Sequence, residues 1–236
     1  MSGQGSRRDE LAANLETVRG RIRAACQDAG RDPGEVSLVV VTKFFPESDV
    51  RLLADLGVRD VGENRHQEAS AKAAACADLG LSWHFIGSIQ SNKAAAVAGY
   101  SDVVESVDRV KLVAGLSRGA GARGHTLDCL VQVSLDPPGS AGRGGAAPGD
   151  VAALAAAIAA AEWLRLCGVM AVAPLGQPAL PAFERLAEIA AALRGEHPDA
   201  RVVSAGMSGD LEEAIRCGAT HVRVGSAVLG PRPGIK

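Results

Sequence analysis

Lys43 is the residue whose type and position are most unusual for its surroundings. The chain has five lysines among 25 basic residues, and this one follows directly on the apolar, β-branched run Val36–Thr42. Burial at the end of such a strand lowers the pKa of an amine and makes the amine nucleophilic. A lysine can form an imine with a carbonyl compound, which an arginine cannot do. The alternative interpretation is a lysine whose stem is buried while its amine reaches water.

Two loops near the C-terminus contain residues that could hold a phosphate group. Gly206–Asp210 (GMSGD) follows one expected strand, and Val224–Val228 (VGSAV) follows the next. Barrel loops at these places bind phosphate through backbone N–H groups, hydroxyls and a helix N-terminus, and Ser208 and Ser226 are the candidate hydroxyl donors. Helix capping and ordinary glycine turns explain each loop equally well when it is taken alone. Both loops together, opposite Lys43, favour a phosphorylated ligand.

Arg223 is the third candidate, in the last expected strand. The alternation of side chains along a strand places Arg223 on the same face as His221 and Gly225. An arginine that points into the mouth of a barrel needs a partner. One candidate is the ring nitrogen of a pyridine cofactor, whose protonation the permanent positive charge would disfavour. An ion pair with Glu63 or Asp210 is the alternative.

His84 and the cysteines carry weaker signals. A single histidine in a strand is more often a satisfied core or rim residue, and no Gly-x-Ser-x-Gly elbow accompanies it to favour a Ser–His–Asp triad. The five cysteines are odd in number and never spaced as Cys-x-x-Cys. We therefore expect reduced core thiols, with no metal site and no disulfide framework.

Strands and helices alternate regularly along the chain and position these residues. Strands are predicted at Val36–Thr42, Asp60–Val61, Ser82–Ile86, Asp102–Ser106, Thr126–Ser134, Leu164–Ala171, Arg201–Ser204 and His221–Val224. Helices are predicted between them at Glu47–Leu56, Asn64–Leu79, Ser91–Ala98, Val110–Arg118, Asp150–Ala161, Ala179–Arg194 and Asp210–Arg216. Eight such units in about 200 residues predict an α/β fold with parallel strands closed into one (β/α)8 TIM barrel. An open doubly wound sheet would be favoured by a Gly-x-Gly-x-x-Gly motif after the first strand, but Thr42–Pro46 contains no glycine.

An extra helix is expected before the first strand. Apolar residues recur at helical spacing over Arg8–Ala29. We expect residues 1–34 to form a helical extension packed on the barrel, within a single domain spanning residues 1–236. The candidate residues would all lie at the C-terminal ends of barrel strands, where such barrels place reactive groups. The Gly- and Pro-rich loop Asp136–Gly149 would lie on the same side and is expected to be mobile.

Composition argues against several classes of function. A formal net charge of −2 over 236 residues gives no electrostatic footprint for nucleic acid or a membrane surface. No run of 18 apolar residues occurs, and the first residues contain no apolar signal region. We therefore expect a cytoplasmic protein with no membrane and no nucleic-acid partner.

The chain resembles the YggS/PROSC family of pyridoxal 5′-phosphate (PLP) homeostasis proteins over essentially its whole length. The matching stretches occur in the order LVVVTKFFP (38–46), VGENRHQE (61–68), WHFIGSIQSNK (83–93), GVMAV (168–172), SAGMSGDLEEAI (204–215) and HVRVGSAVLGPR (221–232). Several blocks in the correct order are far more specific than any one of them.

This resemblance implies a fold like the N-terminal barrel of alanine racemases, with PLP held as a Schiff base on Lys43. It implies phosphate contacts from Ser208, Gly225 and Ser226. The other implied contacts are Arg223 near the pyridine nitrogen, Asn64 near the cofactor and Met170 beside the ring. The chain departs from the family pattern at several positions, with the family's usual residue in parentheses: Arg65 (often Tyr), Ser88 (Pro), Ser134 (Asn), Ala205 (Met) and, in the loop Asp136–Gly149, Arg143 (Lys).

Family members are regarded as PLP carriers or regulators of vitamin B6 and amino-acid balance, without an established catalytic activity. We therefore expect a non-enzymatic, monomeric PLP-binding protein with PLP-dependent apo-enzymes as possible recipients. One alternative is an amino-acid racemase or lyase that uses Lys43 as acid and base. Racemases, however, take an opposing tyrosine from a second domain, and the only tyrosine here is Tyr100, before the fourth strand. Another alternative is a barrel that binds a different phosphorylated metabolite without an imine.

Overall fold

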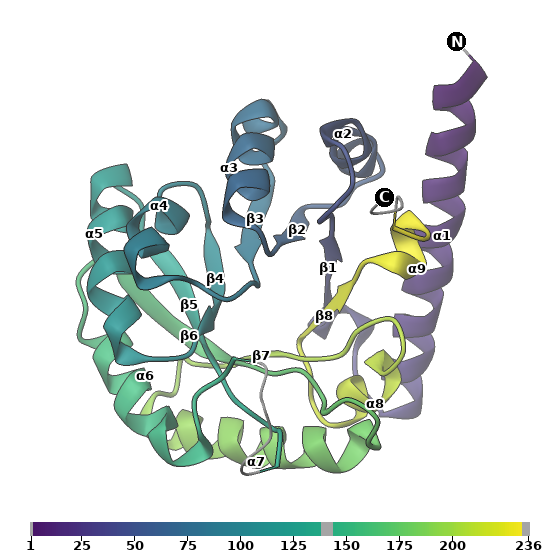
Figure 1. Ribbon diagram of the computed structural model, residues 1–236. Coiled ribbons are helices and arrows are strands. Elements are labelled where there is room, and N and C mark those ends of the chain that lie inside the picture. Colours follow the sequence, from purple (N-terminus) through teal and green to yellow (C-terminus); the bar gives the residue numbers. More distant parts are fainter. Residues whose placement is uncertain (1, 138–143, 233–236) are drawn as a thin grey trace.

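The computed structural model describes residues 2–137 and 144–232 and shows a closed barrel of parallel strands surrounded by helices (Figure 1). The eight strands of this described part are β1 Ser37–Val41, β2 Asp60–Glu63, β3 Ser82–Phe85, β4 Val103–Val107, β5 Leu127–Gln132, β6 Leu164–Met170, β7 Val202–Ser204 and β8 His221–Val224. Each strand pairs with the next in sequence, and β8 pairs with β1, so that Val39 lies opposite Arg223. The predicted (β/α)8 barrel is confirmed.

The helices follow the predicted order, with some shifted ends. They are α1 Ser2–Asp28, α2 Glu47–Asp55, α3 His66–Ala75, α4 Ala94–Ala98, α5 Val113–Arg123, α6 Val151–Ala159, α7 Ala179–Glu196, α8 Leu211–Arg216 and α9 Ser226–Leu229. Helix α3 begins at His66, later than predicted, because Arg65 still has an extended backbone. Helix α5 runs on to Arg123 and ends where Gly124 takes a left-handed φ of 67°. The short helix α9 was not predicted.

Helices α4 and α5 pack at unusually close range, which explains why the glycine-rich segment of α5 remains helical. A Cβ added at Gly119 would lie 2.2 Å from the carbonyl oxygen of Ala95, and one at Gly115 would lie 2.8 Å from the Cβ of Ala94. The two glycines are one helical turn apart, so they lie on the same face of α5. Any larger side chain at either position would push the two helices apart.

The N-terminal helix α1 lies along the outside of the barrel beside α8 and α9 (Figure 1). Its buried face carries the predicted apolar residues, Leu11, Leu15, Val18, Ile22 and Ala25. Arg21 fixes the helix to α8 through two hydrogen bonds to the carboxylate of Glu212, at 2.7 and 2.8 Å. Of the helices in the described ranges, none is both long and apolar enough to cross a membrane.

Buried polar side chains occupy part of the barrel interior. His84 on β3, Glu105 on β4, Ser204 on β7 and Arg223 on β8 are all less than 5% exposed. The hydroxyl of Ser204 donates to Glu105, and these two residues belong to strands that are not neighbours. Their hydrogen bond therefore crosses the inside of the barrel, below the ends of the strands.

Candidate functional site

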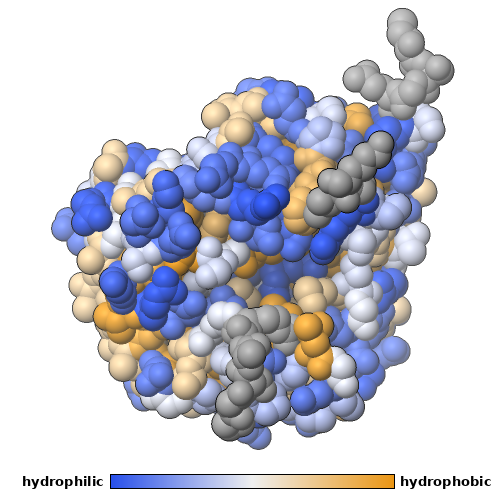
Figure 2. All heavy atoms as spheres, viewed as in Figure 1, coloured by the Kyte–Doolittle hydropathy of each residue, from blue (hydrophilic) through white to orange (hydrophobic). Residues whose placement is uncertain are grey.

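A cavity of about 340 Å³ opens at the C-terminal ends of the strands. The structure brings all the predicted contact residues together in its wall, namely Lys43, Asn64, Met170, Ser208, Arg223, Gly225 and Ser226. The surface in Figure 2 is hollowed near its centre, among side chains that are largely hydrophilic. The volume of the cavity lies within the range of small-molecule sites, roughly 300–1,000 Å³.

Lys43 belongs to a tight turn that ends β1. The N–H of Phe45 donates to the carbonyl oxygen of Thr42 at 3.1 Å, which makes Lys43 and Phe44 the central residues of this turn. Burial lowers the pKa of the Lys43 amine, and the positive charge of Arg232 lowers it further. The site therefore favours the neutral, nucleophilic form of the amine.

The two predicted phosphate loops follow β7 and β8 and keep several donors free. In the structure as described, the backbone N–H groups of Ser208 and Gly209 and the hydroxyls of Ser208 and Ser226 donate no hydrogen bond. The carboxylate of Asp210 instead accepts from the N–H of Met207 at 2.6 Å and closes the loop. Helix capping therefore does not occupy the Ser208 hydroxyl, and the free donors are available to an anion.

Gly206 is the residue that allows the first of these loops to turn. Its φ is +90°, and a Cβ at this position would lie 2.7 Å from the Cβ of Ala214. Any other residue would be strained in its backbone and would collide with α8. The loop that carries Ser208 therefore depends on this glycine.

Arg223 is buried, and its partner is neither Glu63 nor Asp210, which the sequence had suggested as the alternative ion pair. The guanidinium donates to the hydroxyl of Ser204 at 2.7 Å and to the carbonyl oxygen of Ala171 at 2.8 Å. It lies 3.7 Å from a carboxylate oxygen of Glu105. Burial lowers the pKa of Arg223, while Glu105 opposes this effect.

Glu105 connects Arg223 to His84, and the sequence analysis missed it. Burial acts to raise the pKa of Glu105, but the hydrogen bond from His84 (2.7 Å) and the charge of Arg223 lower it to about 2. His84 also contacts Asp60 at 3.2 Å, and despite burial the two carboxylates raise its pKa to about 9. His84 is thus a satisfied core residue. The register between β4 and β5 shifts between Val104 and Val107, so simple alternation could not place Glu105.

A second buried cluster, also missed, lies beside Lys43. The amine of Lys72 on α3 donates to the carbonyl oxygen of Thr42 at 2.8 Å and to the carboxylates of Glu63 and Glu68, each at 2.7 Å. Burial raises the pKa of Glu63, and Lys72 opposes this shift. The signal available in the sequence was the spacing Glu68–Lys72, which places both side chains on one face of a helix.

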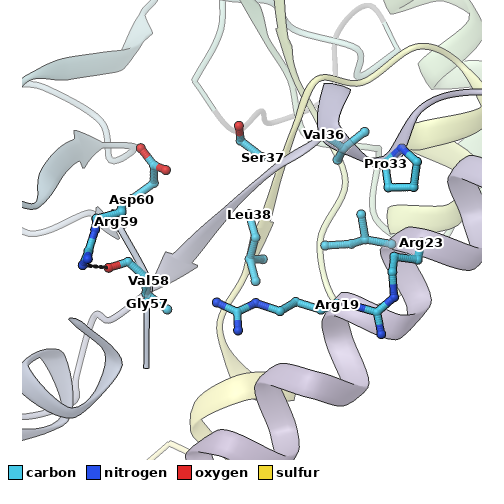
Figure 3. Close-up of a pocket in the computed structure, with 11 residues that line it drawn as sticks. Arg19, Arg23, Pro33, Val36, Ser37, Leu38, Gly57, Val58, Arg59 and Asp60 are labelled. Carbon is cyan, nitrogen blue, oxygen red and sulfur yellow. Dashed lines mark hydrogen bonds between the residues drawn. The ribbon is translucent and has the colours of Figure 1, made fainter. Parts of the chain in front are cut away.

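Another cavity, of about 330 Å³, lies away from the strand ends, between α1 and the starts of β1 and β2 (Figure 3). Arg19, Arg23 and Arg59 surround it, and Leu38 forms part of its wall. None of the predicted contact residues lines it. We therefore take the cavity at the strand ends as the candidate site. Arg143, the predicted replacement of a loop lysine, lies with residues 138–142 of the same loop outside the described residues.

The fold and the site together define a (β/α)8 barrel in which a strand-end amine and two loops with free hydrogen-bond donors line one cavity. Residues 8–233 match the family model of the alanine racemase N-terminal domain. The chain is 44% identical to a pyridoxal phosphate homeostasis protein of Mycobacterium leprae, over 97% of this chain and 95% of that protein. The chain belongs to the family of pyridoxal phosphate homeostasis proteins.

Solved structures support the same assignment. PipY of Synechococcus elongatus PCC7942, solved with PLP bound, has a TM-score of 0.81 and 33% identity, covering 93% of this chain and 100% of that one. Alanine racemase from Corynebacterium glutamicum has a TM-score of 0.67 at 17% identity, and the match covers 97% of this chain and 62% of that one. The second comparison shows the shared fold only.

Proposed function

We propose that this chain binds PLP in the cavity at the strand ends, holds it covalently on Lys43 and acts as a PLP homeostasis protein. The observation that carries the proposal is the convergence, in one cavity wall, of a half-buried amine and two loops with free hydrogen-bond donors. The PLP-bound structure of its relative PipY supports the choice of ligand.

The residues present fit such a ligand. Asn64 lines the cavity, and its buried side-chain oxygen has no hydrogen-bond partner among the described residues. A buried polar atom without a partner costs roughly 1–3 kcal/mol, a cost that a rotation of the Asn64 amide towards a bound polar group would relieve. Backbone N–H groups and hydroxyls of the two loops suit a phosphate. A pyridine ring needs an apolar surface, which Met170 and Ile86 offer.

Each residue then has a defined task. When bound, PLP supplies an aldehyde carbon that an amine can attack to form an imine. Lys43 provides that amine in its neutral form. The hydroxyls of Ser208 and Ser226 donate hydrogen bonds to the phosphate, and so do free backbone N–H groups of the same loops. Arg223, fixed by Ser204 and Glu105, discourages protonation of the ring nitrogen, which weakens the ring as an electron sink.

A carrier rather than an enzyme is the function that the residues support. The hydroxyl of Tyr100 contacts His66 at 3.3 Å and does not line the cavity. Burial and the charge of Glu63 raise the pKa of Tyr100, so this hydroxyl is a poor acid or base at neutral pH. The relative from Mycobacterium leprae is named as a homeostasis protein. We infer that Lys43 has no opposing acid or base among the residues that the structure describes and that bound PLP is passed on to apo-enzymes.

Trapping by borohydride tests the proposal. The apo-protein is incubated with PLP, reduced with borohydride and digested, and the modified lysine is located by mass spectrometry. We expect the adduct on Lys43, together with an absorbance change that is lost in Lys43→Ala and retained in the exposed control Lys111→Ala. An unmodified Lys43 in the wild-type protein would overturn the proposal. PLP retained without an adduct would indicate the non-covalent alternative.

A further inference from the structure

The turn that presents Lys43 contains an unfavourable backbone conformation. Phe44 has a φ of +72°, a region that residues with a side chain rarely occupy. A positive φ at the third position of a turn is ordinarily supplied by glycine or asparagine. Such a conformation costs about 1–3 kcal/mol and persists only where the surroundings enforce it.

Three buried or half-buried side chains hold the two residues on either side of Lys43. Before it, the carbonyl oxygen of Thr42 accepts from the amine of Lys72 at 2.8 Å, and the hydroxyl of Thr42 donates to Glu63 at 2.7 Å. After it, the N–H of Phe44 donates to Glu68 at 2.5 Å. Lys72 donates to the same oxygens of Glu63 and Glu68 that bind the turn. The turn is therefore bound to a single cluster centred on Lys72.

Lys72 has no other task in the part of the chain that the structure describes. Its side chain is only 8% exposed, and its three N–H donors are used on Thr42, Glu63 and Glu68. It does not line the cavity. Burying the charged amine of a lysine costs free energy, because the charge must be taken out of water. A residue that served only to fill this space would more simply be apolar.

The charges of the cluster also act on the Lys43 amine. Glu63 and Glu68 favour its protonated form, while burial and Arg232 favour its neutral form. Other charged groups near the turn are Arg65 and Arg232 at the ring of Phe44, and Arg223 in the cavity wall. Without Lys72, both carboxylates would lose their counter-charge. Glu68 would then stabilise the protonated amine more strongly, whereas the more deeply buried Glu63 would shift towards its neutral form.

We propose that Lys72 is a positioning residue, which fixes the Thr42–Phe45 turn through Glu63 and Glu68 and neutralises these carboxylates so that Lys43 stays reactive. The proposal rests on the proposed function only in taking Lys43 as the reacting amine. Lys72 never touches the ligand in this scheme.

The test measures Lys43 in the apo-protein, so that it does not depend on PLP binding. Trace acetylation with acetic anhydride across pH 6–11, followed by peptide mass spectrometry, gives the pH midpoint at which Lys43 reacts. We expect Lys72→Met to raise this midpoint by about 0.5–1 pH unit, which lowers the reactivity of the Lys43 amine at neutral pH roughly three- to tenfold. The exposed control Lys93→Met leaves the midpoint unchanged.

A second variant separates this effect from general loss of structure. Glu68→Gln retains an acceptor for the N–H of Phe44 but removes one negative charge, so the Lys43 midpoint should fall. Opposite shifts in the two variants support the proposal. Unchanged midpoints in both, or equal shifts in the same direction, overturn it. If PLP forms no adduct on Lys43, the proposed function fails, but the acetylation midpoints still decide the role of Lys72.

Discussion

Replacing Glu105 with glutamine removes the carboxylate that His84 and Arg223 share inside the barrel. His84 lies 2.7 Å and Ser204 2.6 Å from this carboxylate, and the guanidinium of Arg223 lies 3.7 Å away. The glutamine keeps the shape but leaves Arg223 without its nearest counter-charge and leaves His84 with Asp60 as its remaining carboxylate partner. Breaking a buried ion pair from one side typically costs about 3–5 kcal/mol.

The lowered pKa of Glu105 leads to a similar value for the free energy that its charge contributes to stability. Its lowering from the ordinary 4.5 to about 2 corresponds to about 3 kcal/mol. Because the folded-state pKa lies below the unfolded one, this stabilisation is fully present above pH 4.5 and is lost as the pH falls towards 2. We therefore expect Glu105→Gln to lower the free energy of unfolding by about 3 kcal/mol at pH 7. The difference from wild type should shrink to roughly half that value by pH 3.

Urea unfolding of the apo-protein, followed by circular dichroism, measures this difference. The exposed control Glu162→Gln should change the free energy of unfolding by less than about 0.5 kcal/mol. A loss of less than about 1 kcal/mol in Glu105→Gln at pH 7 would refute the reasoning. It would mean that the carboxylate contributes little beyond the cost of burying it.

Four further predictions follow from the same structure. The pKa of His84 is raised to about 9, so its stabilisation is complete below pH 6.5 and lost as the pH rises through 9; unfolding free energies from pH 6 to 10 should decline less in His84→Gln than in wild type. Ser208→Ala should lower the affinity for PLP, measured by spectroscopic titration, about tenfold, because one hydrogen bond to a charged group is lost. The control Arg19→Gln, in the cavity of Figure 3, should leave this affinity unchanged. Exchange of the α-proton of D- and L-alanine in deuterated buffer should stay at the background rate, and enzyme-like exchange that Lys43→Ala abolishes would favour a racemase. Light scattering should give the mass of a monomer, and a dimer would contradict that expectation.

The strands and the residues at their ends could be predicted from the sequence because each depends on a local pattern. Buried parallel strands form short β-branched runs, and the residue after such a run lies at the functional end of the barrel. Lys43, Ser208 and Ser226 were found in this way. Asn64 and Met170 entered only through the family resemblance, because an amide and a thioether carry no distinctive signal by themselves.

The buried partners of these residues could not be predicted, because each depends on contacts that are distant in sequence. Glu105 on β4 and Arg223 on β8 are close in space but have three other strands between them in the sequence, and the register shift in β4 hides the face on which Glu105 lies. Lys72 sits in an alanine-rich helix, where a lysine ordinarily indicates the solvent side. Only the pairing of β1 with β2 and the packing of α3 bring its amine to the carbonyl oxygen of Thr42.

The hydrogen-bonded group of Arg223, Ser204, Glu105 and His84 also bears on how the chain selects a single arrangement of its strands. Apolar interiors tolerate exchange of one aliphatic side chain for another, so they discriminate weakly between neighbouring registers. A slip of one residue in β4 would turn Glu105 towards the apolar helices, take the nearest counter-charge from Arg223 and leave His84 with Asp60 alone, a penalty of several kcal/mol. Misaligned barrels are therefore selected against during folding by the same charges that fix Arg223 beside the cavity.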